Sequence, residues 1–144
     1  MPQPYSGGCA CGAVRYTVTA EPMLSYCCHC TDCQKRTSSA FGLSAMVPTD
    51  RLVIEQGAPK ARTRKGDSGN ELAIHFCGDC GSSLFSAPAA RPQIRVLYAG
   101  TLDEPGGLPV QLNIWTDRAL PWVALDAAIP NEPRQPNMAD YLKR

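Results

Sequence analysis

The feature that most constrains this chain is the placement of its eight cysteines. All eight lie among the first 80 of 144 residues, in three tight groups at positions 9–11, 27–33 and 77–80. A disulfide framework usually spreads its cysteines through a small secreted chain, and it would leave several of these adjacent thiols unpaired. Closely spaced cysteines are typical of metal sites, because one short turn can deliver two thiolates to one ion. The pattern therefore indicates metal ligands rather than disulfide partners.

Length and composition indicate what kind of domain holds these sites and in which compartment we expect it. A chain of 144 residues is about one domain, so we expect a single domain over residues 1–144 that buries a substantial core. The N-terminal residues lack the basic and apolar segments of a signal peptide, and no stretch approaches the ~18–20 apolar residues of a membrane span. We expect no membrane partner and a cytoplasmic location, where thiols stay reduced.

The net charge of the chain argues against nucleic acid as a partner. The net charge is +1 and the pI is about 7.5, which is no electrostatic footprint for nucleic acid. The densest basic run is Lys60–Lys65, in which charged and uncharged residues alternate. We interpret this run as the solvated face of a strand, because no aromatic residues are interleaved with it.

Short alternating segments predict a mainly β fold. Thirteen prolines and twelve glycines punctuate the chain, and apolar residues between them often recur with the period of two typical of strands. Many short strands separated by turns favour a sandwich or barrel-like architecture. The predicted strands are 13–18, 41–47, 51–55, 62–65, 71–76, 83–85, 94–99 and 110–115.

Helical signals are few. We expect one short helix over residues 31–36, begun by Thr31 or Asp32 as the N-cap. The proline-rich segment 130–136 is expected to be irregular, and residues 137–143 are expected to form a last helical turn or to fray.

The first and last cysteine groups together suit a closed zinc site. Each group is a tight pair followed by a glycine, Gly12 or Gly81, that tolerates the positive φ of a sharp turn. Zinc takes four tetrahedral ligands, and a site with four thiolates is structural. Closing it would pin distant strands together, which is a folding role. The four ligands would be Cys9, Cys11, Cys77 and Cys80.

The middle group suits a second, open site. Cys28, Cys30 and Cys33 are the best triplet of ligands, and they leave a fourth zinc position for water or a substrate thiol. Cys27 is an alternative to Cys28, because it also forms a C-x-x-C pair with Cys30. His29 is a candidate fourth ligand, but adjacent residues seldom reach one metal, so we expect its ring to point away and form a hydrogen bond. A redox role for the C-x-x-C pair would need a thioredoxin-like βαβ setting, which the pattern lacks.

Several nearby residues have candidate roles around the second site. Three thiolates and one zinc ion carry a net charge of about −1, which Lys35 and Arg36 could offset while attracting an anionic substrate. Ser38 and Ser39 could donate hydrogen bonds to a substrate or could be turn residues. His75 lies in an alternating segment and is interpreted as structural.

Three motifs give the chain a family resemblance. They are Gly7–Tyr16, Cys28–Lys35 and Phe76–Ser82, with further matches at Ala99–Pro105, Ile114–Trp115 and Trp122. In combination they resemble the glutathione-dependent formaldehyde-activating enzyme family, which also includes centromere protein V. The resemblance covers about residues 5–125, which we take as the core, with residues 126–144 as a C-terminal tail.

The resemblance implies a β-tent-like zinc-binding fold of short antiparallel strands with one short helix. It implies a structural zinc at the four outer cysteines and a second zinc at Cys28, Cys30 and Cys33. It also implies formation of a carbon–sulfur bond between glutathione and formaldehyde. The chain departs from the family pattern at Asn113, where the family often has histidine, because asparagine does not titrate near neutral pH. Cys27 is an eighth thiol beyond the seven expected ligands, and its role stays open.

Two functions from different classes fit these features. The first is a zinc-dependent carbon–sulfur lyase-type enzyme that joins a thiol such as glutathione to a small aldehyde. Its Cys28, Cys30 and Cys33 act through zinc, and Lys35 and Arg36 contact glutathione. The second is a non-catalytic zinc module that binds a protein partner, in which Cys27, His29 or another chain closes the second site. Entry of an external thiol into the metal sphere would distinguish the two.

Overall fold

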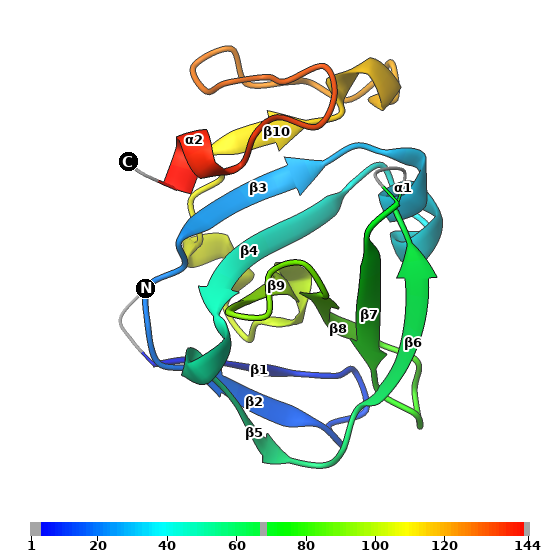
Figure 1. Ribbon diagram of the computed structural model, residues 1–144, viewed down its shortest axis with the longest axis vertical. Helices are drawn as coiled ribbons and strands as arrows, with labels where there is room; N and C mark the ends of the chain where they lie inside the picture. Colours follow the sequence, from blue (N-terminus) through cyan, green and yellow to red (C-terminus); the bar gives the residue numbers. More distant parts are fainter. Residues whose placement is uncertain (1–3, 67–68, 143–144) are drawn as a thin grey trace.

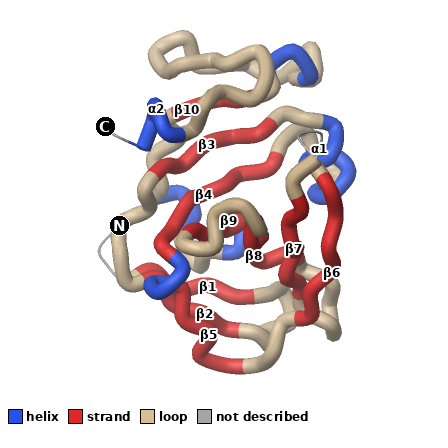
Figure 2. Tube along the Cα trace, in the orientation of Figure 1, coloured by secondary structure: helices blue, strands red, loops and turns tan. Residues whose placement is uncertain are grey.

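The computed structural model describes residues 4–66 and 69–142, and it is mainly β (Figures 1 and 2). The strands are β1 Tyr5–Gly8, β2 Arg15–Val18, β3 Leu24–Cys28, β4 Gly42–Pro48, β5 Leu52–Gln56, β6 Lys60–Lys65, β7 Glu71–Phe76, β8 Ser83–Pro88, β9 Ile94–Tyr98 and β10 Leu112–Ile114. The α-helices are α1 Thr31–Thr37 and the single turn α2 Ala139–Leu142. Of the four short 3₁₀ turns in the described residues, three lie between strands and one, Thr116–Arg118, follows β10. The predicted fold class is confirmed.

Two sheets carry these strands. Strands β1, β2 and β5 form a small antiparallel sheet, and the order of the large sheet is β10-β3-β4-β9-β8-β7-β6. The large sheet curves around the molecule, and the small sheet lies at the bottom of the view in Figure 1. Within the described residues, no helix is long and apolar enough to cross a membrane.

One strand departs from the predicted antiparallel arrangement. β10 pairs with β3 in parallel, so that Leu112 lies opposite Tyr26 and Ile114 lies opposite Cys28. The chain leaves β9 through two 3₁₀ turns, Ala99–Thr101 and Pro105–Gly107, and returns to the free edge of β3 in the same direction as that strand.

The core has two parts, one on each face of the large sheet. Val14, Tyr16 and Val18 share one face of the segment that contains β2, as their spacing predicts, and they pack with Val47 and Leu97 between the two sheets. On the opposite face of the large sheet, a second apolar cluster includes Leu24, Tyr26, Cys28, Met46, Ile94, Leu112, Ile114 and Met138.

Two strands were absent from the sequence-based prediction. β1 contains two glycines, which weaken a strand pattern, and all five residues of β3 are buried, so β3 does not alternate. The N-cap prediction was wrong as well, because helix α1 begins after Cys30, whose sulfur accepts a hydrogen bond from the Cys33 N–H at 3.4 Å. The predicted last turn at 137–143 contains α2, and Lys143 lies outside the described residues.

Candidate metal centres

The structure brings the four outer cysteines together. Their sulfur atoms all lie within 4.8 Å of one another, although Cys11 and Cys77 are 66 residues apart. The Cys9–Cys11 and Cys11–Cys77 sulfur distances are 3.6 and 3.8 Å. Ligands about 2.3 Å from a tetrahedral zinc would lie about 3.8 Å from one another, so this spacing fits the ion.

Two glycine turns present these sulfurs. The turn after β1 closes with hydrogen bonds between Cys9 and Val14 and between Gly12 and Cys9, and the turn after β7 closes with one from the Gly81 N–H to the Cys77 carbonyl. Gly12 and Gly81 have φ angles of +82° and +80°, as the expected sharp turns require. The cluster therefore joins the β1–β2 turn of the small sheet to the β7–β8 turn of the large sheet (Figure 1).

Backbone N–H and hydroxyl donors reach at least three of these four sulfurs. The Val14 N–H donates to the Cys9 sulfur at 3.2 Å, and the Asp79 N–H donates to the Cys77 sulfur at 3.4 Å. The pKa of Cys80 is lowered to about 5, chiefly by hydrogen bonds from the hydroxyl and N–H of Ser82. At least three of the four sulfurs thus receive N–H or O–H donors, an arrangement that suits a bound cation.

The second cluster consists of Cys28, Cys30 and Cys33. Their sulfurs also lie within 4.8 Å of one another, with Cys28 at the end of β3, Cys30 at the N-cap and Cys33 in the first turn of α1. Cys28 donates to the Cys30 sulfur at 3.2 Å. Hydrogen bonds from Cys28, Cys33 and nearby N–H groups lower the pKa of Cys30, and the pKa of the donor Cys28 is raised.

Cys27 and His29 face away from this cluster. Cys27 is buried and is not a member of either sulfur group. His29 is 1% exposed, and its Nε2 lies 3.0 Å from Oδ1 of Asn113, whose amide donates to Oδ1 of Asn131. Because that Asn113 amide points at Asn131, Oδ1 of Asn113 accepts from His29 Nε2–H, and Nδ1 of His29 is left without a partner within the described residues. The two positions singled out in the sequence, His29 and Asn113, are therefore one hydrogen-bonded pair.

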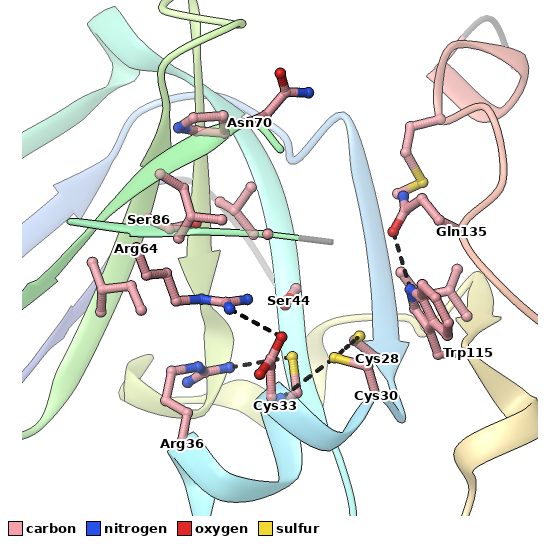
Figure 3. Close-up of a pocket in the computed structure, with 18 of the residues that line it drawn as sticks. Cys28, Cys30, Cys33, Arg36, Ser44, Arg64, Asn70, Ser86, Trp115 and Gln135 are labelled. Atoms are coloured by element: carbon pink, nitrogen blue, oxygen red, sulfur yellow. Dashed lines mark hydrogen bonds and ion pairs between the residues drawn. The ribbon is translucent and has the colours of Figure 1, made fainter. Parts of the chain in front are cut away.

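The second cluster opens into a cavity of about 700 Å³, which the four outer cysteines do not line. One face of the large sheet forms its floor, where Ser44 of β4 and Ser86 of β8 lie (Figure 3). The cavity belongs to the size range of sites for small organic ligands. This cavity is the feature that sequence reasoning did not find, because its lining comes from most strands of the large sheet.

Cationic side chains flank the cysteines on one side of the cavity. Arg36 lies with its guanidinium carbon 3.5 Å from the centre of the Tyr98 ring and donates toward the Cys33 sulfur at 4.0 Å. A Cβ on Gly42 would lie 2.6 Å from that guanidinium, so glycine leaves room for Arg36 here. Arg64 pairs with Asp32 at 2.9 Å, and Lys35 is an exposed member of the lining.

Among three expectations about nearby residues, the structure changes the first, narrows the second and leaves the third unchanged. The basic run in β6 is more than a solvated face, because Arg62 and Arg64 line the cavity. The alternation of these two residues along the strand was the signal that could have shown that they share one face. Ser38 and Ser39 lie at the end of α1 and do not line the cavity, and Ser38 is a left-handed C-cap. His75 stacks on Phe85 at 4.4 Å, in keeping with a structural role.

Comparisons with known proteins point to one family. The model of the family described as "Glutathione-dependent formaldehyde-activating enzyme" matches residues 4–118. A protein of Emericella nidulans, provisionally named as a glutathione-dependent formaldehyde-activating enzyme, is 29% identical over 77 residues. That alignment spans 54% of this chain and only 38% of the relative.

A solved structure shares the fold. The crystal structure of a Rhodobacter sphaeroides protein superposes with a TM-score of 0.53 at 17% identity, over 88% of this chain and 98% of that one. At this identity the likeness concerns the fold alone. The family match over most of the chain, together with the two cysteine clusters that the fold assembles, shows that this protein belongs to the glutathione-dependent formaldehyde-activating enzyme family.

Proposed function

We propose that this protein is a zinc-dependent enzyme of the carbon–sulfur lyase type that joins an anionic thiol such as glutathione to a small aldehyde. The observation that carries the proposal is the position of the Cys28–Cys30–Cys33 cluster at the wall of the 700 Å³ cavity. Three cysteines leave one coordination position free, which is the arrangement of catalytic rather than structural zinc. The four outer cysteines would hold a second, structural zinc.

The donor sets fit zinc at both places. Thiolate sulfur is a preferred zinc ligand, and the sulfur groups have the compactness that one tetrahedral ion needs. When bound at the three-cysteine site, zinc would lower the pKa of a thiol ligand and so favour a nucleophilic thiolate near neutral pH. Free thiols of this kind persist in a reducing compartment, which supports the cytoplasm as the proposed location.

Basic side chains of the cavity lining would supply the positive charge that binds the thiol substrate. Arg36, Arg64 and Lys35 give the cavity a cationic side that suits the carboxylates of glutathione. Arg36 is preorganised, because it stacks on Tyr98 and its guanidinium lies within reach of Cys33. It is therefore placed both to offset thiolate charge and to hold a substrate carboxylate beside the cluster.

The reaction is an addition without oxidation or reduction. The thiolate sulfur forms a bond to the carbonyl carbon while the C=O π bond breaks, and the resulting alkoxide takes a proton from solvent. The product is an S-(hydroxyalkyl) thioether, that is, a hemithioacetal, and it is S-hydroxymethylglutathione when the reactants are glutathione and formaldehyde. The reverse steps release the aldehyde, so the protein would speed up equilibration in both directions.

The test joins metal content to catalysis. Protein purified without added metal should contain about two zinc ions per chain, and Cys30→Ser should contain about one and retain the fold. Exchange NMR with ¹³C-formaldehyde and glutathione should show faster interconversion with wild-type protein than with Cys30→Ser or with free zinc at the same concentration. Two zinc ions without any acceleration would contradict the enzyme and favour the non-catalytic zinc module.

A matched variant tests the cationic side. Arg36→Gln should raise the KM for glutathione about tenfold, since charge-assisted hydrogen bonds contribute about 1.5–3 kcal/mol. Arg118→Gln is the control, because Arg118 is exposed and does not line the cavity. Equal KM values for the two variants would remove Arg36 from the substrate site.

A further inference from the structure

The cavity has two chemically different sides, with the cysteine cluster between them. Figure 3 shows Arg36 and Arg64 on one side of Cys28, Cys30 and Cys33, and Trp115 and Gln135 on the other. Apart from Gln135, the second side is mainly apolar. Met46, Ile114 and Met138 belong to the same buried cluster as Cys28, with Val96 and Trp115 packed against it.

A segment outside the family match completes this apolar side. The family model ends at residue 118, whereas the C-terminal strap (residues 130–138) contributes Met138 to the cavity wall. The strap runs along β10 and is held there by backbone hydrogen bonds from Asn113 to Pro130 at 3.0 Å and from Glu132 to Asn113 at 2.8 Å. The wall is therefore a built part of the fold and not a loose tail.

Trp115 is fixed against this strap. Its φ is +58°, a left-handed conformation that bulky residues rarely adopt, and its indole Nε1 donates to Oε1 of Gln135 at 3.3 Å. Backbone hydrogen bonds on both sides of it, from Trp115 to Arg134 and from Thr116 to Glu132, hold this conformation. The surroundings thus hold an aromatic ring at the cavity wall beside the thiolates.

Formaldehyde has no substituent that could pack against such a wall, because its carbonyl carbon bears only hydrogen atoms. A cavity of about 700 Å³ is in the size range of sites for drug-sized ligands, so it has room for a substituent on the aldehyde beside the thiol. The cationic side already suits the carboxylates of the thiol, which leaves the apolar side for a substituent on the carbonyl carbon. Burying that substituent against Trp115 and Met138 would add hydrophobic binding energy in proportion to its area.

We propose that the aldehyde partner of this enzyme carries an apolar substituent of several carbons, which packs against Trp115 and against Met138 of the C-terminal strap. The inference rests on the proposed function and names its substrate class. The reaction keeps its balance: the S–C bond forms, the C=O π bond breaks, and the product is RS–CH(OH)–R′ with R′ against the apolar wall. The strap is then the element that sets specificity for R′.

The test uses stable thioethers that bind but cannot react. Isothermal titration of the zinc-loaded protein would compare S-methyl-, S-butyl- and S-hexylglutathione, whose alkyl groups stand in for R′. Each methylene buried should tighten binding up to about fourfold, so the hexyl compound should bind at least about tenfold more tightly than the methyl compound. Equal affinities across the series would overturn the inference.

Two tryptophans provide a matched pair of variants. Trp115→Gly removes the ring and relaxes the left-handed backbone, so the hexyl-to-methyl affinity ratio should fall toward one. Trp122→Gly removes a side chain that is 74% exposed and outside the cavity lining, and should keep the wild-type ratio. If Trp115→Gly does not fold, Gln135→Ala keeps the ring but frees it from the strap, and the ratio should fall by a smaller factor.

The outcomes separate the two proposals. The thioethers have no free thiol, so a steep chain-length dependence supports the apolar site even if formaldehyde exchange is not accelerated. Acceleration of formaldehyde exchange with a flat chain-length series leaves the enzyme standing and overturns only the apolar substituent. An unchanged ratio in Trp115→Gly, with a steep series in the wild type, overturns the placement beside Trp115.

Discussion

At the scale of single residues, the hydrogen-bonded series His29, Asn113 and Asn131 shows how the hydrogen-bonding groups of one buried side chain determine which residue fits beside it. Asn113 is buried, accepts from the fully buried His29 ring and donates to Asn131. A histidine at position 113 would offer one ring nitrogen as donor and the other as acceptor, in a different geometry, whereas the amide of Asn113 does both from one short group. The departure from the family pattern at Asn113 therefore has a structural explanation, and neither Asn113 nor His29 lines the cavity.

Asn113→Ala should destabilise the protein by about 1–3 kcal/mol, because it leaves the buried Nε2–H of His29 without an acceptor. Urea denaturation of the zinc-loaded protein measures the change. Gln93→Ala, at an exposed position, should change stability by no more than about 0.5 kcal/mol. Equal effects of the two substitutions would show that the hydrogen bond to His29 carries no net stability.

Cys27→Ala should leave the zinc content at about two ions per chain. Cys27 lies on the opposite side of β3 from Cys28, is 6% exposed and is absent from both sulfur groups. Elemental analysis by mass spectrometry gives the zinc-to-protein ratio, with Cys28→Ala as the matched change at the neighbouring position. A loss of zinc from Cys27→Ala, with Cys28→Ala unchanged, would place Cys27 rather than Cys28 in the second site.

At the scale of elements, the small sheet contains a buried tyrosine that makes stability sensitive to alkaline pH. Tyr16 of β2 is 1% exposed, and its hydroxyl hydrogen-bonds to Oγ1 of Thr101 at 2.8 Å. Burial raises the pKa of Tyr16 from 10.0 to about 12. In the unfolded chain Tyr16 ionises near pH 10, whereas in the folded protein it stays neutral until about pH 12, so its contribution is complete below pH 10 and is lost as pH rises to about 12.

The full loss should amount to about 3 kcal/mol, because one pKa unit corresponds to about 1.4 kcal/mol, and about 2 kcal/mol of it should occur below pH 11.5. Urea unfolding at a series of pH values from 8 to 11.5 measures it. Tyr16→Phe should be less stable than the wild type at pH 8 by the lost hydrogen bond, but its stability should fall less steeply above pH 10. Parallel curves for the two proteins would mean that Tyr16 does not titrate abnormally.

The C-terminal strap and the turn α2 give a second prediction at this scale. Met138 is 6% exposed and packs in the cluster that contains Ile114 and Cys28. Met138→Ala should cost about 2–5 kcal/mol through lost burial and the cavity that remains. Met23 is 38% exposed, so Met23→Ala removes the same atoms and should cost much less. Similar unfolding midpoints for the two variants in urea would show that the strap does not pack on the sheet in solution.

At the scale of the whole molecule, the sequence predicts features that a short segment determines by itself. It misses features that distant segments form together in the fold. Strand β7 has the predicted bounds, Glu71–Phe76, because its alternation is clear and Cys77 begins a turn. The two sulfur groups were also predictable, since ligand spacing is a local signal in both groups and flanking glycines mark the outer cysteine pairs. Strand β3 was not, because complete burial removes the period of two.

The cavity could not be predicted from any segment. Its lining combines alternate residues of several strands with the strap, and these meet only because β10 adds to β3 in parallel at the sheet edge. The position of Arg64 shows the difficulty: in the sequence it is one of a run of charges, and only the curvature of the sheet brings it near Asp32 at the start of α1 (Figure 1). The proposed substrate cavity is thus a property of the topology.

The last prediction concerns the unequal dependence of the fold on its two proposed zinc ions. The four-cysteine cluster links two hairpin turns through residues as distant as Cys11 and Cys77, so metal bound there would contribute its binding energy directly to folding. The three-cysteine cluster joins residues only a few positions apart, at the end of β3 and the start of α1. Removing one sulfur from each cluster should therefore lower zinc content equally and stability unequally.

Cys80→Ser and Cys30→Ser make this comparison. Cys80 is exposed, so its replacement removes little packing, and a loss of more than about 3 kcal/mol in urea unfolding would come from the metal. Cys30→Ser should lose one zinc ion per chain with a change below about 1 kcal/mol, since serine can still cap α1 through its oxygen. Chelator titration should likewise release one zinc before unfolding begins and the other only with it. If both variants unfold at the same urea concentration, the four-cysteine cluster does not hold the two sheets together through a metal.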